Sequence, residues 1–434
     1  MRFAIAFLWV AACLAQMPAP GHGIEGTMSR LASSTAARPE TVRVLFYGQS
    51  ITKQNWWRSV ADDLRARFPS ADLRIENRAI GGYSTQYLIR TMEADILPFH
   101  PDLIIFHDYG PEDLYEKIIR WIRSNTTAEI LLQNDHVVWL PGEEDANGSR
   151  RKGFDAQERH SFEWLPELAR KYGLGLVDLR RGWHDHLAKN QLNSKELLSD
   201  AVHLNRKGEA LYASLTQAYL VVPAMLEPNE MVQDIPPLWR NGRLDIDFDG
   251  NRVELFGLQG GPVDVFVDGK RPAELGLFYH SRPTNTWDAD WPSVRHVGHD
   301  RPLQTEDWVV KVTQRDTPGT TFSYEVYGSL TGLDGAGKST EKFVSKSGRV
   351  ILEPGDYDVE RSFGLHKIAM PGSWQIRWST LPQFIDPVLP AAGAQTIVYG
   401  ISNGRHHLTL IAPRGAESSI RKLRIYTPPL KDKP

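Results

Sequence analysis

Residues 42–68 read VRVLFYGQSITKQNWWRSVADDLRARF, and this stretch decides the fold of the chain. The run Val42–Tyr47 is mostly apolar, as expected of a strand buried on both faces. After a short turn, apolar residues recur at helical spacing over 54–68, with Trp57, Val60 and Leu64 on one face. A buried strand that leads through a tight turn into an amphipathic helix is the first half of a strand–helix–strand unit.

The same alternation continues to Pro223. Further strands are expected at 73–76, 103–106, 129–133 and 175–178, and further helices at 84–94, 111–123, 156–172 and 204–220. Strands that alternate with helices form a parallel sheet covered on both faces, and ligands bind at the carboxyl ends of its strands. Residues 41–223 are therefore predicted to form a three-layer α/β/α catalytic domain.

Beyond Pro223 the pattern changes to strand-length runs without a convincing helix. Pro236 and Pro237 mark a boundary, and the runs that follow predict an antiparallel β-sandwich or jelly-roll domain over 238–434. Within it, the polar and aromatic stretch 278–300 is either a packed loop between domains, or a wall over the active site or sugar-binding platform.

The N-terminus has the pattern of an export signal. Residues 1–20 combine a charged start, an apolar run too short to span a bilayer, and two prolines. The sequence VAAC at 10–13 also resembles a lipobox, which makes a lipid anchor at Cys13 the alternative. Residues 21–40 are predicted to be a linker. We therefore expect a secreted or periplasmic protein, or a lipoprotein anchored through Cys13.

The composition is that of a globular protein. The chain has 434 residues, of which 41% are hydrophobic, enough for two cores. Its formal net charge of −3 argues against a nucleic-acid partner held by bulk electrostatics, and no later segment has the length of a transmembrane span. Because Cys13 is the only cysteine, the folded part is expected to have no disulfide and no thiol chemistry.

Ser50 stands at the carboxyl end of the first expected strand, where backbone N–H groups at a helix start favour negative charge. Taken alone, Ser50 could simply cap the helix. Asp200 and His203, three residues apart before the last helix, point to a catalytic role instead. The carboxylate can accept the Nδ1 proton of the imidazole and leave Nε2 as the base for a serine nucleophile.

Together these residues resemble the SGNH (GDSL-type) hydrolase superfamily over about residues 42–220. Gly48-Gln49-Ser50-Ile51 matches its nucleophile block, residues 77–82 (NRAIGG) match its oxyanion block, and Asp200 with His203 match its last block. The resemblance implies a flavodoxin-like domain with catalytic Ser50, His203 and Asp200. It also implies an oxyanion hole formed by the N–H groups of Ser50 and Gly82, and no cofactor.

Two positions depart from the family pattern. Gln49 replaces the usual aspartate, and Glu112 falls where the family has an asparagine that donates to the oxyanion. Loss of one such donor costs about 2.7–4 kcal/mol. Three outcomes are open: His107 or another group donates while Glu112 turns away, Glu112 is protonated and donates, or the site has changed to other chemistry such as glycoside cleavage.

Further polar residues follow the third and fourth strands. His107, Asp108, Glu112 and His136 are candidates for lining the pocket, although His136 could equally lie on a surface loop. A metal site built from His107, Asp108, Asp135 and His136 is conceivable, but no ligand spacing demands one, and no metal is predicted.

Three functions fit these observations. The first is an exported esterase that removes small acyl groups, acetyl above all, from carbohydrate. The second is a glycosidase on the same scaffold, with Glu112, Asp108 or Asp200 as working carboxylates. The third is a protein that binds carbohydrate without catalysis.

Overall fold

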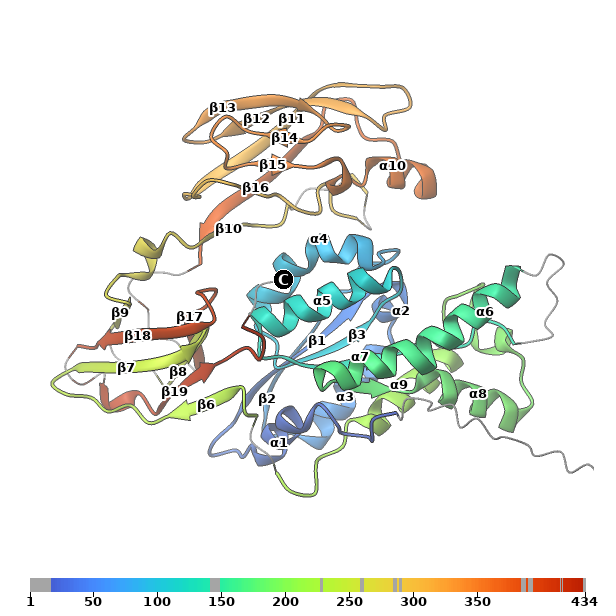
Figure 1. The fold of residues 1–434 in the computed structure, drawn as a ribbon, viewed down its shortest axis with the longest axis horizontal. Coiled ribbons are helices and arrows are strands. Elements are labelled where there is room, and N and C mark those ends of the chain that lie inside the picture. The colour runs from blue at the N-terminus through green and yellow to red at the C-terminus, as the bar shows by residue number, and fades with distance from the viewer. Residues whose placement is uncertain are drawn as a thin grey trace, which may run out of the picture.

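The structure, a computed structural model, describes residues 17–140, 149–226, 229–257, 261–283, 287–288, 291–383, 388, 393–413, 415 and 417–431. It consists of an α/β domain followed by antiparallel sheets (Figure 1). Cys13 and most of the predicted export signal lie outside the described residues. Among the residues described, none of the helices is both long enough and apolar enough to cross a bilayer.

The α/β domain is built on a five-stranded parallel sheet in the order β2-β1-β3-β4-β5. Its strands are β1 (Thr41–Gly48), β2 (Asp72–Asn77), β3 (Leu103–His107), β4 (Glu129–Gln133) and β5 (Gly175–Val177). This is the flavodoxin-like order, and it confirms the predicted fold class. The order reverses between β1 and β3, which is where ligands bind in sheets of this kind.

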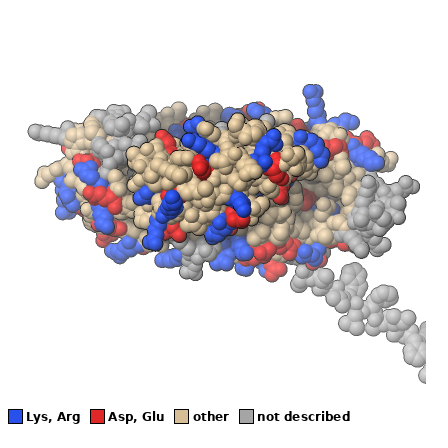
Figure 2. All heavy atoms as spheres, turned by 90° about the horizontal axis from the view of Figure 1, so that it is seen from above, with Lys and Arg blue, Asp and Glu red and all other residues tan. Residues whose placement is uncertain are grey.

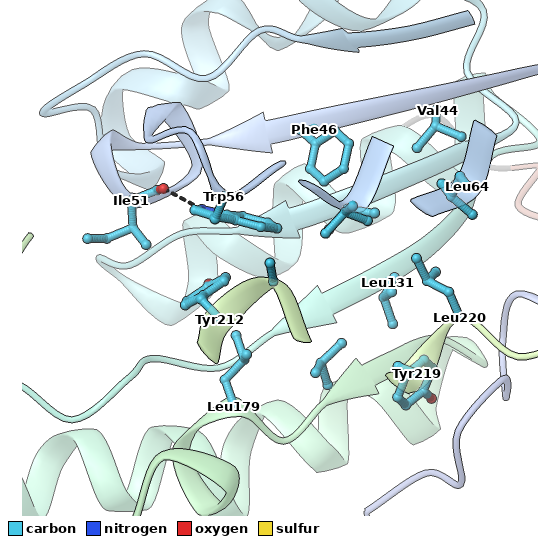
Figure 3. Packing of buried hydrophobic residues seen from close by; sticks show 14 of the residues in the cluster. Val44, Phe46, Ile51, Trp56, Leu64, Leu131, Leu179, Tyr212, Tyr219 and Leu220 are labelled. Carbon is cyan, nitrogen blue, oxygen red and sulfur yellow. Dashed lines mark hydrogen bonds between the residues drawn. The ribbon is translucent and has the colours of Figure 1, made fainter. Parts of the chain in front are cut away.

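Alternate residues of β1 pack against helices on opposite faces of the sheet. Val44 and Phe46 belong to one core, and Leu45 and Tyr47 to the other. The first core is covered by α1 (Glu25–Ser33), α2 (Ser50–Lys53), α3 (Trp56–Arg67), α8 (Leu179–Asn190) and α9 (Arg206–Tyr219). The second is covered by α4 (Thr85–Ile96), α5 (Glu112–Asn125) and α7 (Leu165–Tyr172). Figure 3 shows the first core, in which Trp56 Nε1 donates to the carbonyl oxygen of Ile51 at 2.6 Å.

Three parts of the α/β domain differ from the sequence prediction. The segment 21–40 is not a linker: it contains α1, whose Met28 and Leu31 are buried against the sheet. The helix α8 was not predicted. The helix expected at 156–172 begins earlier, as α6 (Ser149–Arg159), and reaches α7 through a π-helical turn at residues 160–164.

The C-terminal region has two hydrophobic cores rather than the single sandwich expected over 238–434. The first lies between a four-stranded sheet, β17-β8-β19-β6, and a three-stranded sheet, β7-β18-β9. Their strands are β6 (Val232–Ile235), β7 (Arg243–Gly250), β8 (Arg252–Phe256), β9 (Asp264–Val267), β17 (Ala394–Val398), β18 (Gly404–Ile411) and β19 (Lys422–Tyr426). Since β6 pairs with β19, this sandwich begins before residue 238.

The second core belongs to a unit inserted between β9 and β17, here called the inserted sheet (residues 278–382). Its strand order is β10-β16-β11-β12-β13, with β14 and β15 as a separate pair. The elements are β10 (Phe278–His280), β11 (Glu306–Arg315), β12 (Phe322–Gly328), β13 (Gly332–Lys338), β14 (Phe343–Val344), β15 (Ile351–Leu352), α10 (Val359–Arg361) and β16 (Gln375–Pro382).

The two β units contact different parts of the α/β domain. The sandwich meets the amino ends of the parallel strands, where Arg43 pairs with Glu254 at 3.0 Å. The inserted sheet lies over α4 (Figure 1), where Arg90 donates to Asp356 at 2.8 Å. Seen from that side, basic and acidic side chains are interspersed on the surface (Figure 2).

Candidate active site

The side chains of Ser50, His203 and Asp200 form one hydrogen-bonded chain at the carboxyl end of β1. Ser50 is the first residue of α2, and the other two lie in the loop before α9. His203 Nε2 is 3.0 Å from Ser50 Oγ, and His203 Nδ1 is 2.8 Å from Asp200 Oδ2. With the Nδ1 proton donated to Asp200, Nε2 can accept the proton of the serine hydroxyl.

Backbone hydrogen bonds and a buried histidine hold the Asp200–His203 loop. Asp200 Oδ1 accepts from the N–H groups of His203 at 2.7 Å and Val202 at 2.8 Å. These two bonds and the side-chain bond to His203 lower the pKa of Asp200 to about 2. His136 Nε2 donates to the Val202 carbonyl at 2.8 Å, which ties the end of β4 to this loop. Burial lowers the pKa of His136 to about 4, so the ring is neutral at physiological pH.

Behind Ser50 runs a second, buried chain that begins at Gln49. Gln49 Oε1 lies 2.9 Å from Ser50 Oγ and accepts from the Ile51 N–H at 3.0 Å. Its Nε2 is 2.9 Å from His107 Nδ1, and His107 Nε2 is 2.8 Å from Asp135 Oδ1. Burial alone would raise the pKa of Asp135, but the hydrogen bond and charge of His107 outweigh it and lower the pKa to about 2.

The loop that follows β2 runs beside the nucleophile turn. Asn77 Nδ2 donates to the Thr52 carbonyl at 2.6 Å, and the Ile80 N–H donates to the Gly48 carbonyl at 3.0 Å. A Cβ placed on Gly81 would lie 3.9 Å from Ser50 Cβ. Gly82 has a φ of 75°, a conformation that glycine adopts without strain. The loop therefore carries Gly82 into the wall of the same pocket as Ser50.

This pocket has a volume of about 840 Å³. Besides Gln49, Gly82 and the Ser50–His203 pair, it is lined by Ile51, Tyr109, Gly110, Glu112, Asp135, His136, Val138, Ala156, Gln157, Arg159, His160 and Val202. Most of these side chains are polar or ionisable. In the described part of the chain, no group of three or more His, Cys, Asp or Glu side chains is arranged to hold a metal ion.

With this geometry in place, the sequence was compared with known families. Residues 45–211 match the GDSL-like Lipase/Acylhydrolase family. The matched segment is a GDSL-like lipase/acylhydrolase domain. It is thus a hydrolase domain that acts on ester bonds, and the predicted family is confirmed. Among curated proteins none matches the chain.

Solved structures with similarity to the chain include three esterases. A two-domain esterase (CEX) active on acetylated mannans, co-crystallised with mannopentaose, is 16% identical over 96% of this chain and 98% of that chain, with a TM-score of 0.38. The acetyl xylan esterase AlAXEase is 20% identical over 42% and 100%, with a TM-score of 0.35. The acetylxylan esterase Axe2 from Geobacillus stearothermophilus is 18% identical over 43% and 99%, with a TM-score of 0.36.

Two residues expected to line the pocket of the GDSL-like domain lie behind its wall instead. His107 is fully buried, with both ring nitrogens engaged by Gln49 and Asp135, so it cannot also donate to a substrate oxygen. Asp108 is 2% exposed, and its Oδ1 accepts from the Tyr109 N–H. Burial raises the pKa of Asp108 well above its usual range.

Glu112 does line the pocket, but its carboxylate is occupied. It accepts from Arg159 at 2.8 Å and lies 3.4 Å from His160 Nδ1. The Glu112 side chain, which stands where the family has its asparagine, thus points to α6 and to the turn after it. Arg159 and His160 were missed by sequence reasoning, because nothing local in α6 shows which helix face meets the site. The sequence Asn134-Asp135-His136 at the end of β4 did signal Asp135.

Proposed function

We propose that this chain is an exported serine esterase that removes small acyl groups, acetyl above all, from carbohydrate. The observation that carries the proposal is the hydrogen-bonded chain from Ser50 through His203 to Asp200, which opens into the 840 Å³ pocket. Export rests on the sequence pattern of residues 1–20.

In the proposed reaction Ser50 Oγ attacks the ester carbonyl and gives its proton to His203 Nε2. Asp200, ionised and fixed by two backbone N–H groups, orients the ring and stabilises the imidazolium. The N–H groups of Ser50 and Gly82 receive the oxyanion. His203 then protonates the leaving sugar oxygen, and water cleaves the acyl-enzyme by the same steps in reverse order.

The pocket lining offers hydrogen-bond partners for a sugar beside apolar contacts for a small acyl group. The apolar side chains are Ile51, Val138, Ala156 and Val202. Carboxylate, imidazole, guanidinium and phenol groups surround them and can bond sugar hydroxyls. A volume of about 840 Å³ also accommodates more than one sugar ring beside a small acyl group.

The carboxylates required for glycoside cleavage are engaged elsewhere. Glu112 is held by Arg159 and His160, and Asp200 by His203 and two N–H groups. Asp108 lies behind the pocket wall. These contacts leave none of the three free to protonate a glycosidic oxygen, which supports esterase over glycosidase chemistry.

The test compares acetate release with reducing-sugar release from the same acetylated oligosaccharides. Ser50→Ala is expected to abolish acetate release, with no reducing sugar formed by either protein. The matched control is Ser214→Ala, which removes an exposed hydroxyl of α9 that donates to the Leu211 carbonyl, and should leave acetate release unchanged. Full activity of Ser50→Ala, or reducing-sugar release by the wild type, would overturn the proposal.

A further inference from the structure

The inserted sheet reaches the α/β domain at the oxyanion loop. Trp291 Nε1 donates to the Gly81 carbonyl at 2.7 Å, and Arg361 donates to the Gly82 carbonyl. Trp291 is only 4% exposed and belongs to the same buried cluster as apolar side chains of α4 and α5. Both donors come from residues more than 200 positions downstream of the glycines they bind.

The bond from Trp291 acts on the peptide unit that contains the Gly82 N–H. The Gly81 carbonyl and the Gly82 N–H belong to the same planar trans peptide, so they point in opposite directions. A donor fixed on the carbonyl therefore sets the direction of the N–H. It also polarises the amide, which makes the N–H a stronger donor.

The loop is a turn closed by one backbone hydrogen bond, from the Tyr83 N–H to the Ile80 carbonyl at 3.2 Å, and this bond does not involve the peptide between Gly81 and Gly82. Glycine has the widest conformational freedom of all residues, and Gly81 and Gly82 are adjacent. A Cβ on Gly82 would lie 3.0 Å from Arg361 Nη2 and 3.4 Å from the Trp291 ring. The inserted sheet thus occupies the space that a side chain would need, and its bond to the Gly81 carbonyl adds a second restraint to the hydrogen bond that closes the turn.

The two donors are themselves held in place. The Trp291 ring stacks on His366 at 4.3 Å between centroids, and His366 Nδ1 is 2.9 Å from Asp288. The Arg361 guanidinium lies 4.7 Å from the Trp291 ring and 4.2 Å from the Tyr87 ring.

The neighbouring residue Tyr83 is fixed to the inserted sheet as well, because its hydroxyl donates to Asp358, which also pairs with Arg295. The residue that follows the two glycines is therefore also held by the inserted sheet.

From this geometry we propose that Trp291 and Arg361 are positioning residues of the oxyanion hole, through which the inserted sheet takes part in catalysis. This inference rests on the proposed role of the Gly82 N–H in ester hydrolysis. Trp291 and Arg361 touch neither the nucleophile nor the reacting ester. They act by holding the Gly81 and Gly82 peptides so that the N–H points at the developing oxyanion.

Trp291→Phe tests the proposal in the full-length chain, because it keeps an aromatic ring and removes the indole N–H. We expect kcat for p-nitrophenyl acetate to fall about 10-fold with KM unchanged. That is less than the roughly 10²–10³-fold cost of removing an oxyanion donor altogether. The affinity for a boronic acid, which forms a tetrahedral adduct with the nucleophile, should fall by a similar factor. Trp287→Phe is the matched control, because the buried Trp287 Nε1 has no hydrogen-bond partner among the residues that the structure describes.

The outcomes separate this inference from the proposed function. If Ser50→Ala is inactive but folded Trp291→Phe keeps both kcat and boronic-acid affinity within twofold of wild type, the positioning role is refuted. If Ser50→Ala retains activity, the proposed function itself fails. Where Trp291→Phe lowers the thermal midpoint markedly, Arg361→Met tests the second contact, at the carbonyl of the next peptide, and is expected to lower kcat with KM unchanged.

Discussion

Replacement of Gln49 by leucine probes the buried chain behind the nucleophile. Leucine has nearly the volume of glutamine, so the change removes hydrogen bonds without leaving a large cavity. The change removes the hydrogen bonds that Gln49 makes with two buried groups. These groups are Nδ1 of the fully buried His107 ring and the N–H of Ile51. An orphaned buried polar group costs about 1–3 kcal/mol, so the two together should lower the free energy of unfolding by about 2–6 kcal/mol.

The free energy of unfolding can be followed by urea titration with far-UV circular dichroism, because nearly all helices belong to the α/β domain. A loss of this size is a large share of the roughly 5–15 kcal/mol by which domains are stable. Gln217→Leu is the matched control, because Gln217 is partly exposed and its side chain donates to the Ser59 carbonyl. This substitution should change the free energy of unfolding by no more than about 0.5 kcal/mol. A loss below about 1 kcal/mol for Gln49→Leu would show that the chain through His107 does not stabilise the nucleophile turn.

Two further predictions concern carboxylates of the pocket. Glu112→Gln should keep kcat for p-nitrophenyl acetate within about threefold of wild type, because the Glu112 carboxylate is bound by Arg159 rather than by reacting atoms; steady-state kinetics showing a loss beyond 100-fold would contradict this. Asp135 has a folded pKa of about 2 against an ordinary value of 3.8, so its stabilising effect is complete above pH 4 and is lost as the pH falls towards 2. The difference in urea midpoint between wild type and Asp135→Asn should therefore shrink from pH 6 to pH 3. A difference in midpoint that stays constant over this pH range would contradict the prediction.

The parallel sheet could be predicted because its signals are local. Most strands of the α/β domain are short apolar runs, and most helices follow with clear periodicity. The order of elements and the positions of Ser50, Asp200 and His203 at strand or helix ends therefore follow from the sequence. That His203 comes within 3.0 Å of Ser50 is a consequence of both residues lying at one edge of one sheet.

The helix α1 could not be predicted because its N-terminus is stabilised by a distant residue. No side chain of its own caps it, and the Glu129 carboxylate accepts from the N–H groups of Gly26 at 2.9 Å and Thr27 at 2.7 Å. That acceptor lies about 100 residues further along the chain, so the segment reads as a linker when taken alone.

The division of the C-terminal region was missed for a similar reason. Alternating apolar runs predict strands but not their partners. The strands β8 and β17 are paired although the whole inserted sheet lies between them in the sequence. Two cores built from interleaved segments have the same local pattern as one sandwich.

The two departures from the family pattern are connected through β3. Gln49 reaches the end of that strand and uses His107 as its partner, so the last residue of β3, itself bonded to Asp135 after β4, supports the nucleophile turn from behind. Glu112, where the family has its donor asparagine, is bound to Arg159 instead. Under the proposed mechanism, the N–H groups of Ser50 and Gly82 then carry a larger share of the oxyanion charge. The direction of the Gly82 N–H matters more in such a site, which gives the hydrogen bond from Trp291 of the inserted sheet a catalytic consequence beyond packing.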